Sequence, residues 1–333
     1  MHKEDQLVEK FARAVPSIVG HRGSGALRLG IGDDSAILSP GGRSDWILSC
    51  DAFLEGVHFL AKAHPADSVG YKSLVRAASD LVAMGASPRY FLMTLALPAS
   101  RIGTWLDAFL AGMARAARYL GMRLIGGDTT KSGSVSISIT VLGEVPRGRA
   151  LRRSGARPGD LIYVTGKLGR AQLGLELVRA NLARRSGLQN VLRQHLYPRI
   201  PVKLGEWLAR SQTASAMMDI SDGLSTDLIR LCVASRTGAR IEAQHVPRVS
   251  IPAGLFRGAR RMDPLQMALH GGDDYGLLIA VPRRRVNRLQ RAPDFLSLTC
   301  IGEITPDRRI LLVNDNGSTT ALEAHGWDPF RRK

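Results

Sequence analysis

The stretch Ser134–Val145 reads SVSISITVLGEV and alternates between polar and apolar residues. Every second residue from Val135 to Val141 is apolar, so these side chains fall on one face of an extended chain and the hydroxyl side chains fall on the other. This period of two predicts a β-strand with one buried face. The strand is therefore one half-buried element of a mixed α/β or α+β domain.

The residues before this strand supply the other elements of such a domain. Asp67–Met84 has helical spacing and follows Pro65, and 101–120 predicts a second helix of small and apolar residues. The strands that we expect are 27–38 and 46–50 around a Gly-Gly turn at 41–42, a buried strand 90–97, and a short strand 122–125 that runs into Gly126-Gly127-Asp128.

A second mixed pattern follows the turn residues and the step in charge between Pro146 and Asp160. Its predicted strands are 161–165, 215–219, 239–243, 275–280 and segments near 298–313, and its predicted helices are 169–183, 202–210, 222–235 and 262–270. The sequence therefore predicts an α/β (α+β) protein with two domains, 1–146 and 147–333.

Length and composition agree with two globular domains. The chain has 333 residues, of which 44% are hydrophobic and 23% charged, a mixture that excludes disorder as the main state. No apolar run reaches the ~20 residues of a membrane-spanning helix, and the first residues show no apolar signal region. The three cysteines are far apart and form no C-x-x-C motif, so we expect a cytoplasmic protein with reduced thiols.

The charge is uneven along the chain. The formal net charge is +17, of which +2 lies in residues 1–146 and +15 in the rest. Such a field attracts phosphates, so a nucleotide and a nucleic acid are both open as ligands, as is a bias towards arginine without function. Aromatic residues make up only 5%, and no nucleic-acid-binding motif is present, which argues against the nucleic acid.

The common nucleotide-binding signatures are missing. Gly166-Lys167 lacks the other residues of a P-loop, and Gly30-Ile31-Gly32 continues into Asp33-Asp34 without a third glycine. If this protein binds phosphate groups, it must bind them through a different kind of site.

Acidic residues at strand ends and glycine turns provide a candidate. They are Asp33-Asp34, Asp51 after Ser49-Cys50, Asp80, Asp128, Asp219 and Asp222. Carboxylates that converge repel by roughly 4 kcal/mol per pair at ~4 Å and an effective dielectric near 20, so a cluster of them favours Mg²⁺. The alternative is that each Asp is a turn former: Asp222 as a helix N-cap, Asp80 in an i, i+4 ion pair with Arg76, and Gly126–Asp128 as a hairpin turn.

Three further groups are candidates for contact with an anionic ligand. His58 could donate a hydrogen bond or be structural, and Gly271-Gly272-Asp273-Asp274 could be a cation-facing or phosphate-facing turn or a turn only. Arg152-Arg153 could reach a phosphate or be a solvated basic pair.

The ordered motifs GIGDDSAIL, SCDAFLEGVHF, SDLVAMGASP, LIGGDTT, RSGARPGD-LIYVTG, MDISDGLSTDL and GGDDYGLL, with HGWDPF at 325–330, resemble thiamine-monophosphate kinases. That family belongs to an ATP-binding superfamily with aminoimidazole-ribonucleotide synthetase, selenophosphate synthetase and a hydrogenase-maturation protein. The resemblance implies an N-terminal α/β domain that binds ATP and Mg²⁺ and forms a homodimer. It also implies a C-terminal α/β domain that completes the nucleotide and substrate site between the two domains.

The resemblance also implies roles for individual residues. The residues implied to bind several Mg²⁺ ions are Asp34, Ser49, Cys50, Asp51, Asp80, Asp128, Asp219 and Asp222. Those implied to contact ATP are Gly127, Arg153 and Ser221, and those implied to face thiamine monophosphate are His58, Asp273 and Trp327.

Three positions depart from the family pattern. Cys50 replaces the usual Thr, so its backbone carbonyl is a harder metal ligand than its thiol. Asp273 replaces a Glu, and Gly276 replaces a second Glu. These departures bear most on the substrate pocket.

The implied reaction is the ATP-dependent phosphorylation of thiamine monophosphate to thiamine diphosphate, the last step of thiamine diphosphate biosynthesis. Direct in-line transfer needs neither a covalent nucleophile nor a general base, because the attacking phosphate oxygen is largely deprotonated near pH 7. The alternative within enzymes is a superfamily member that activates an amide, selenide or carbamoyl group, but no reactive Cys precedes Cys50, which argues against the selenium branch.

Overall fold

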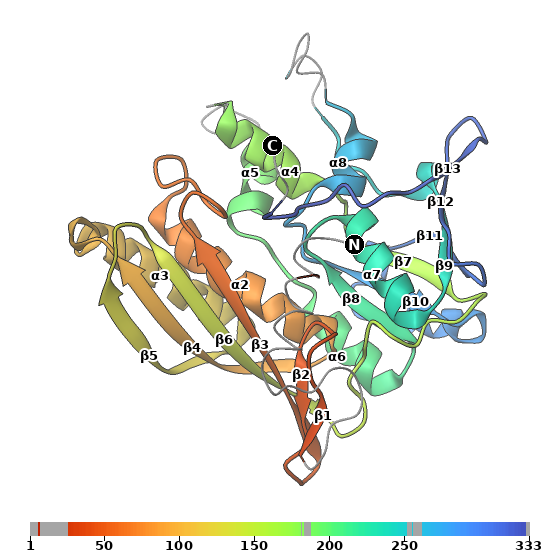
Figure 1. The fold of residues 1–333 in the computed structure, drawn as a ribbon, viewed down its shortest axis with the longest axis horizontal. Helices are drawn as coiled ribbons and strands as arrows, with labels where there is room; N and C mark the ends of the chain where they lie inside the picture. Colours follow the sequence, from red (N-terminus) through yellow and green to blue (C-terminus); the bar gives the residue numbers. More distant parts are fainter. Residues whose placement is uncertain are drawn as a thin grey trace. The chain divides into compact units, whose positions relative to one another are not determined.

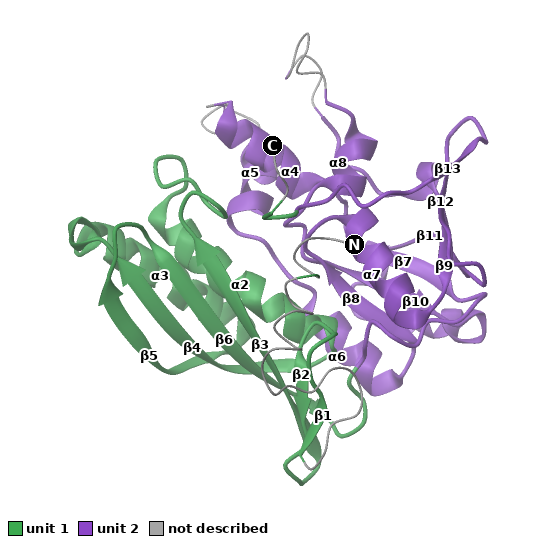
Figure 2. Ribbon diagram, in the orientation of Figure 1, with its two compact units in different colours: residues 1–150, 328–333 green, residues 151–327 purple. Residues whose placement is uncertain are grey.

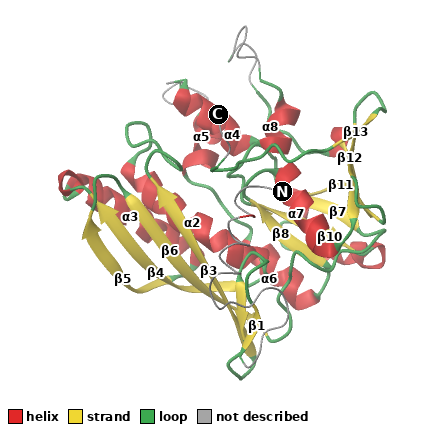
Figure 3. Cartoon of the chain, in the orientation of Figure 1, coloured by secondary structure: helices red, strands yellow, loops and turns green. Residues whose placement is uncertain are grey.

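The computed structural model describes residues 6, 26–180, 182, 188–251, 255 and 262–330. The chain divides into two compact units, one of residues 1–150 and 328–333 and one of residues 151–327 (Figure 2). Each unit has its own sheet and helices, as the α/β prediction requires (Figure 3).

The first unit is built on a six-stranded sheet with the order β1-β2-β3-β6-β4-β5 (Figure 1). Its neighbours pair antiparallel except β4 and β5, which are parallel. The strands are β1 (Leu27–Leu29), β2 (Ala36–Leu38), β3 (Ser44–Leu54), β4 (Ser87–Leu97), β5 (Arg123–Lys131) and β6 (Ser136–Pro146).

Two helices accompany this sheet, α2 (Ala66–Ala83) and α3 (Thr104–Leu120), with the 3-10 turn η1 (Ala99–Arg101) before α3. Helix α2 packs on β3, β4 and β6, and α3 packs on α2. A Cβ at Gly70 would lie 2.0 Å from the carbonyl oxygen of Phe109, and one at Gly112 would lie 1.8 Å from that of Asp67. Glycine at these two positions therefore allows the close approach of α2 and α3.

The alternation in 134–145 is confirmed in β6. Its residues 137, 139, 141, 143 and 145 are buried, while the residues between them are partly exposed. Strand β3 alternates in the same way between Ser44 and Phe53, apart from partly exposed positions on the buried side near its middle. One face of the sheet is thus covered by helix and the other is open.

Two local predictions in this unit are wrong. Residues 27–38 form two short strands with a loop at 30–35, because the residues from Gly30 to Asp34 favour turns over a continuous strand. Gly126–Asp128 lies inside β5, which excludes the hairpin turn. A register shift at Ile125 lets β5 continue along β4 through the two glycines.

The second unit is built on a seven-stranded sheet with the order β13-β12-β9-β11-β7-β10-β8. Strands β9 and β12 are parallel, and the other neighbours are antiparallel. The strands are β7 (Leu161–Thr165), β8 (Ala216–Ile220), β9 (Gly238–Glu242), β10 (Gly276–Val281), β11 (Leu298–Thr305), β12 (Ile310–Val313) and β13 (Thr319–Ala321).

Helix α7 packs on β8, β9 and β10, and the main core of this unit lies between this helix and the sheet. A smaller core joins α4 to α8. The helices are α4 (Arg170–Arg179), α5 (Gln189–Leu196), α6 (Val202–Ser211), α7 (Leu224–Ser235) and α8 (Pro264–His270), with the 3-10 segments η2 (Ala243–His245), η4 (Arg283–Arg291) and η5 (Phe295–Ser297).

Two elements were not predicted from the sequence. Helix α5 is short and polar and buries only His195 and Leu196, so it carries little periodic signal. Strand β13 has three residues, all exposed. Residues 181 and 183 of the predicted helix 169–183 lie outside the described residues. Among the helices that the structure describes, none combines the length and the hydropathy needed to cross a membrane.

Candidate functional site

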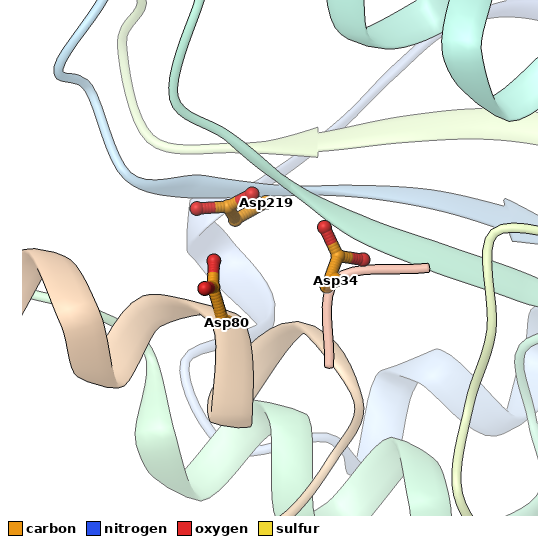
Figure 4. Close-up of side chains that lie close together, drawn as sticks. All are labelled: Asp34, Asp80 and Asp219. Atoms are coloured by element: carbon orange, nitrogen blue, oxygen red, sulfur yellow. The ribbon is translucent and has the colours of Figure 1, made fainter. Parts of the chain in front are cut away.

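In the first unit, two acidic residues of the predicted metal set lie close together. Asp34 is buried in the loop between β1 and β2, and Asp80 lies in the last turn of α2. One carboxylate oxygen of Asp34 and one of Asp80 lie within 4.8 Å of each other. Figure 4 labels both side chains, together with Asp219 of the second unit. Two carboxylates at this separation form an all-oxygen pair of the kind that Mg²⁺ prefers.

Two residues of β3 point toward the same helix. The Ser49 hydroxyl donates a hydrogen bond to Oδ2 of Asp80. Asp51 accepts two hydrogen bonds from Arg76 of α2, from Nε at 2.7 Å and from Nη2 at 3.3 Å. Arg76 therefore pairs with Asp51, a partner that the sequence did not indicate.

Cys50 lies between these two residues and points to the opposite face of β3. Its sulfur is 3.5 Å from the Ser138 hydroxyl and 3.4 Å from the Thr140 hydroxyl on the open side of β6, and the residue is exposed. Because side chains alternate along a strand, the Cys50 thiol cannot join the carboxylate of Asp51 on one ion. The Cys50 thiol therefore lies on the opposite face of β3 from Ser49 and Asp51.

Gly127 and Asp128 lie on β5, which is the edge strand of the sheet and is exposed along its whole length. A Cβ at Gly127 would lie 1.9 Å from the carbonyl oxygen of Met93 on β4. Strand packing is thus sufficient to require glycine here. Asp128 is in register with Thr94, and its carboxylate is open to solvent.

His58 follows β3 in a turn. Its Nδ1 accepts a hydrogen bond from the backbone N–H of Leu54 at 2.9 Å, and its ring stacks on Phe53 with 5.6 Å between ring centroids. An Nδ1 that accepts places the proton of the neutral imidazole on Nε2. The turn therefore presents His58 as a hydrogen-bond donor through Nε2.

In the second unit, the junction of β8 and α7 brings together the residues of the DISDG motif. Asp219 is only 2% exposed, and its Oδ1 accepts a hydrogen bond from the Ser221 hydroxyl at 3.4 Å. The N-cap of α7 is Gly223, and no side chain caps it there, so the N-cap prediction for Asp222 is wrong. Instead Asp227 folds back and accepts the backbone N–H groups of Ser221 and Asp222, each at 3.1 Å.

The charges at this junction are balanced by Arg230. Its Nη1 contacts Oδ2 of Asp222 and lies 3.2 Å from Oδ1 of Asp227. Burial, and next the carboxylate of Asp222, raise the pKa of Asp227 well above its ordinary value, while Arg230 opposes this shift. Asp222 keeps a partly exposed carboxylate beside this buried pair.

The Gly271–Tyr275 turn leads into β10 beside the same junction, because the backbone N–H of Asp273 donates to the carbonyl of Ser221 at 2.8 Å. The hydroxyl of Tyr275 donates to Oδ1 of Asp273 at 2.6 Å. Asp273 and Tyr275 both have positive φ, 70° and 50°, which is uncommon for residues other than glycine. Such backbone strain is often found at functional sites.

Asp274 has a different role from Asp273. It is buried and accepts the backbone N–H groups of Gly169 at 2.6 Å and Ala171 at 3.1 Å, at the start of α4. Burial raises the pKa of Asp274 to about 7, although these hydrogen bonds lower it. Asp274 therefore anchors the turn, whereas the Asp273 carboxylate accepts the hydroxyl of Tyr275.

The HGWDPF segment reaches this junction as well. The backbone N–H of Trp327 donates to the carbonyl of Asp222 at 2.9 Å, and that of Gly326 donates to the Thr226 hydroxyl at 3.2 Å. Trp327 is 42% exposed. Asp222, Asp273 and Trp327 are thus neighbours, although about 50 residues separate each from the next in the sequence.

Arg153 lies at the start of the second unit. Its backbone carbonyl accepts a hydrogen bond from the Ser235 hydroxyl at 2.9 Å, and the same oxygen of Ser235 accepts the N–H groups of Gly155 and Ala156. This network holds the backbone of Arg153 against the end of α7.

Sequence reasoning missed four residues of these sites: Arg76, Asp227, Arg230 and Tyr275. An acidic residue in the first turn of a predicted helix is a signal that could have identified Asp227. The two arginines and the tyrosine carry no such signal, because their roles depend on contacts with other elements.

Both units match known families. The chain matches the AIR synthase related protein family, with the N-terminal domain over residues 32–145 and the C-terminal domain over residues 157–313. The thiamine-monophosphate kinase of Escherichia coli (strain K12) is 38% identical over 308 residues, which is 91% of this chain and 92% of that protein. The chain belongs to the thiamine-monophosphate kinase family. It is therefore an enzyme, a thiamine-phosphate kinase.

Solved structures of thiamine-monophosphate kinases share its fold. AaThiL complexed with AMPPCP and TMP is similar with a TM-score of 0.84 and 29% identity, over 98% of this chain and 97% of that chain. The thiamine-monophosphate kinase from Stenotrophomonas maltophilia K279a is similar with a TM-score of 0.74 and 34% identity, over 89% and 93% of the two chains. The sequence resemblance to this family is confirmed.

Proposed function

We propose that this enzyme transfers the γ-phosphoryl group of ATP to thiamine monophosphate and forms thiamine diphosphate, the last step of that biosynthesis. The observation that carries the proposal is the similarity to AaThiL, whose complex contains AMPPCP, an ATP analogue, and TMP. The 38% identity to the thiamine-monophosphate kinase of Escherichia coli (strain K12) over 91% of this chain supports it.

The residues proposed to hold Mg²⁺ suit that ion. Their side-chain donors are carboxylate and hydroxyl oxygens, and Asp34 and Asp80 already lie within 4.8 Å through one oxygen each. The proposed ligands are Asp34, Ser49, the carbonyl of Cys50, Asp51, Asp80, Asp128, Asp219 and Asp222. Bound Mg²⁺ would neutralise the phosphate charge that develops in the transfer.

The chain's own groups bind and orient the two anionic substrates. We assign Gly127, Arg153 and Ser221 to ATP. The acceptor phosphate oxygen attacks the γ-phosphorus in line, and no side chain has to remove a proton or form a covalent bond. Catalysis then rests on orientation and on charge stabilisation.

The second substrate is the acceptor of the phosphoryl group. We assign His58, Asp273 and Trp327 to thiamine monophosphate. His58 offers an N–H through Nε2 to the phosphate, the carboxylate of Asp273 is held by Tyr275, and the exposed ring of Trp327 can lie against a cationic aromatic ring.

The test is direct. Purified protein is incubated with ATP, Mg²⁺ and thiamine monophosphate, and the products are resolved by phosphorus NMR. Thiamine diphosphate and ADP in equal amounts support the proposal, whereas ADP without thiamine diphosphate, or no turnover, contradicts it.

We also propose that two copies of the chain form a two-fold homodimer through the first unit. The edge strand β5 is exposed along its length, and Leu124 and Ile125 on it are 52% and 54% exposed. Tyr90 and Leu92 on β4 add exposed apolar surface beside it. An exposed apolar sheet edge of this kind is suited to pairing with a second chain.

The separation of Asp51 and Asp128 supports the same dimer. Strands β3 and β5 are three positions apart in the sheet, which is about 14 Å at a strand spacing of ~4.8 Å. The two carboxylates of one chain therefore cannot share an ion. A second copy that presents its Asp128 to Asp51 would remove this separation.

Subunit mixing tests this arrangement. Light scattering should give a dimer at micromolar concentration. If Asp51→Asn and Asp128→Asn dimers are mixed and allowed to exchange, a hybrid has one intact site, so about a quarter of wild-type activity should return. If light scattering gives a monomer, or if mixing restores no activity although subunits exchange, this dimer is wrong.

A further inference from the structure

Two aspartates that the proposed function assigns to Mg²⁺ are each held by an arginine of their own unit. Asp51 pairs with Arg76 in the first unit, and Asp222 pairs with Arg230 in the second. Clustered carboxylates repel one another, so a chain that folds without metal needs another cation at these places. The two guanidinium groups supply that charge.

Arg76 takes both oxygens of Asp51. Nε lies 2.7 Å from Oδ2, and Nη2 lies 3.3 Å from Oδ1, the two-pronged geometry of a strong arginine–carboxylate pair. The side chains are 23% and 25% exposed, so solvent screens the pair only in part. The guanidinium carbon also lies 6.0 Å from the centroid of the Phe53 ring, which helps to hold Arg76 over β3.

We propose that Arg76 is a built-in counter-ion that occupies Asp51 in the metal-free enzyme and competes with Mg²⁺ for this carboxylate. The inference rests on the proposed function, because it takes Asp51 as a Mg²⁺ ligand. An ion that binds Asp51 has to displace at least one of the two hydrogen bonds of Arg76 and lies beside a fixed positive charge. Arg76 therefore lowers the affinity for free Mg²⁺ and keeps Asp51 oriented until the ion arrives.

Arg230 pairs with Asp222 as Arg76 does with Asp51, but it also contacts a second acidic residue. Its Nη1 also lies 3.2 Å from the fully buried Asp227, whose charge it helps to balance. Removal of Arg230 would leave a buried acid without this partner and disturb the fold. Arg76 is therefore the position at which the competition can be measured separately.

The experiment measures Mg²⁺ binding by the nucleotide-free and thiamine-free enzyme, by isothermal titration calorimetry at constant ionic strength. The variant is Arg76→Gln. A unit charge about 5 Å from a divalent ion, at the dielectric of water, weakens binding by about tenfold, so the variant should bind Mg²⁺ about tenfold more tightly. Thermal melting with and without Mg²⁺ gives a second readout, in which the ion should raise the melting temperature of the variant more than that of the wild type.

The matched control is Arg115→Gln. Arg115 is in the same unit and forms a comparable pair with Asp67 at 2.9 Å, but neither residue belongs to the proposed metal set. It should leave Mg²⁺ affinity within about twofold of wild type, since Arg115 pairs with none of the proposed ligands and its side chain is more exposed than that of Arg76. In the Asp51→Asn background, Arg76→Gln should not increase the affinity for Mg²⁺, because the carboxylate for which Arg76 and Mg²⁺ compete is absent.

The outcomes separate this inference from the proposed function. Unchanged or weaker Mg²⁺ binding by Arg76→Gln overturns the counter-ion role, even if the wild type phosphorylates thiamine monophosphate. An equal gain in Arg115→Gln overturns it too, because general charge would then be the cause. Failure of the wild type to form thiamine diphosphate overturns the proposed function and is seen in a different assay.

Discussion

A Gly326→Ala substitution, which adds one methyl group, tests how the HGWDPF segment packs against Asp222 and Thr226. A Cβ at Gly326 would lie 2.0 Å from the carbonyl oxygen of Asp222 and 2.5 Å from the Thr226 hydroxyl. Gly326→Ala must therefore push the segment away by more than 1 Å. This movement breaks both the hydrogen bond from Trp327 N–H to Asp222 and that from Gly326 N–H to Thr226.

The size of the effect follows from these two bonds. At about 1 kcal/mol each, their loss weakens docking by ~2 kcal/mol, which corresponds to roughly a 30-fold change in the population of the docked segment. Because Trp327 is proposed to contact thiamine monophosphate, the KM for this substrate should rise by up to this factor. The KM for ATP should stay within about twofold, since the residues assigned to ATP are not moved.

The assay is steady-state kinetics with each substrate varied in turn, together with a melting curve. Gly133→Ala is the control, because no heavy atom lies within 4 Å of its added Cβ, and it should match wild type in both KM values and in melting temperature. A Gly326→Ala enzyme with wild-type KM for thiamine monophosphate would refute the placement of Trp327 at the substrate.

Three further results are expected. Asp51→Asn and Asp128→Asn should each lower turnover by at least about 100-fold, because a ligand of the charge-neutralising ion is lost. Asp128→Asn should melt as the wild type does, whereas Asp51→Asn also loses its ion pair with Arg76 and should melt at a lower temperature. Normal turnover per folded molecule in either variant would instead indicate a turn-forming residue. Trp327→Ala should raise the KM for thiamine monophosphate several-fold, through loss of a ring contact of roughly 1 kcal/mol. Asp273→Glu should change the KM for thiamine monophosphate more than the KM for ATP. If only the KM for ATP changes, both residues belong to the nucleotide side. Burial raises the pKa of Asp274 to about 7, so the folded state keeps a proton that the unfolded state has lost, and stability should fall as pH rises from 4 to 7. Urea unfolding of Asp274→Asn across this range should give a flatter profile, and a profile parallel to wild type would contradict the assignment.

Local patterns determined the elements of this protein. The period of two in 134–145 predicted β6, and the helical spacing of 67–84 predicted α2, because side-chain direction follows backbone geometry within a few residues. The glycine and aspartate motifs were specific enough in order and spacing to indicate the family, and the similarity over 91% of the chain confirmed it. The boundary near Gly30 was wrong because turn residues interrupt the predicted strand, and the boundary near Gly126 was wrong because pairing with β4 continues β5 through two glycines.

Only the tertiary structure decided which partners these residues meet. The alternation of β3 places Ser49 and Asp51 on one side and Cys50 on the other. Only the packing of α2 against the first side brings Ser49 into contact with the carboxylate of Asp80. The pair of Asp51 with Arg76 spans 25 residues, and the contact of Trp327 with Asp222 spans more than 100. A sequence pattern reports the direction of a side chain along its own element. The neighbour that it faces depends on how separate elements pack, because only packing brings distant charges within the few ångströms at which they bind.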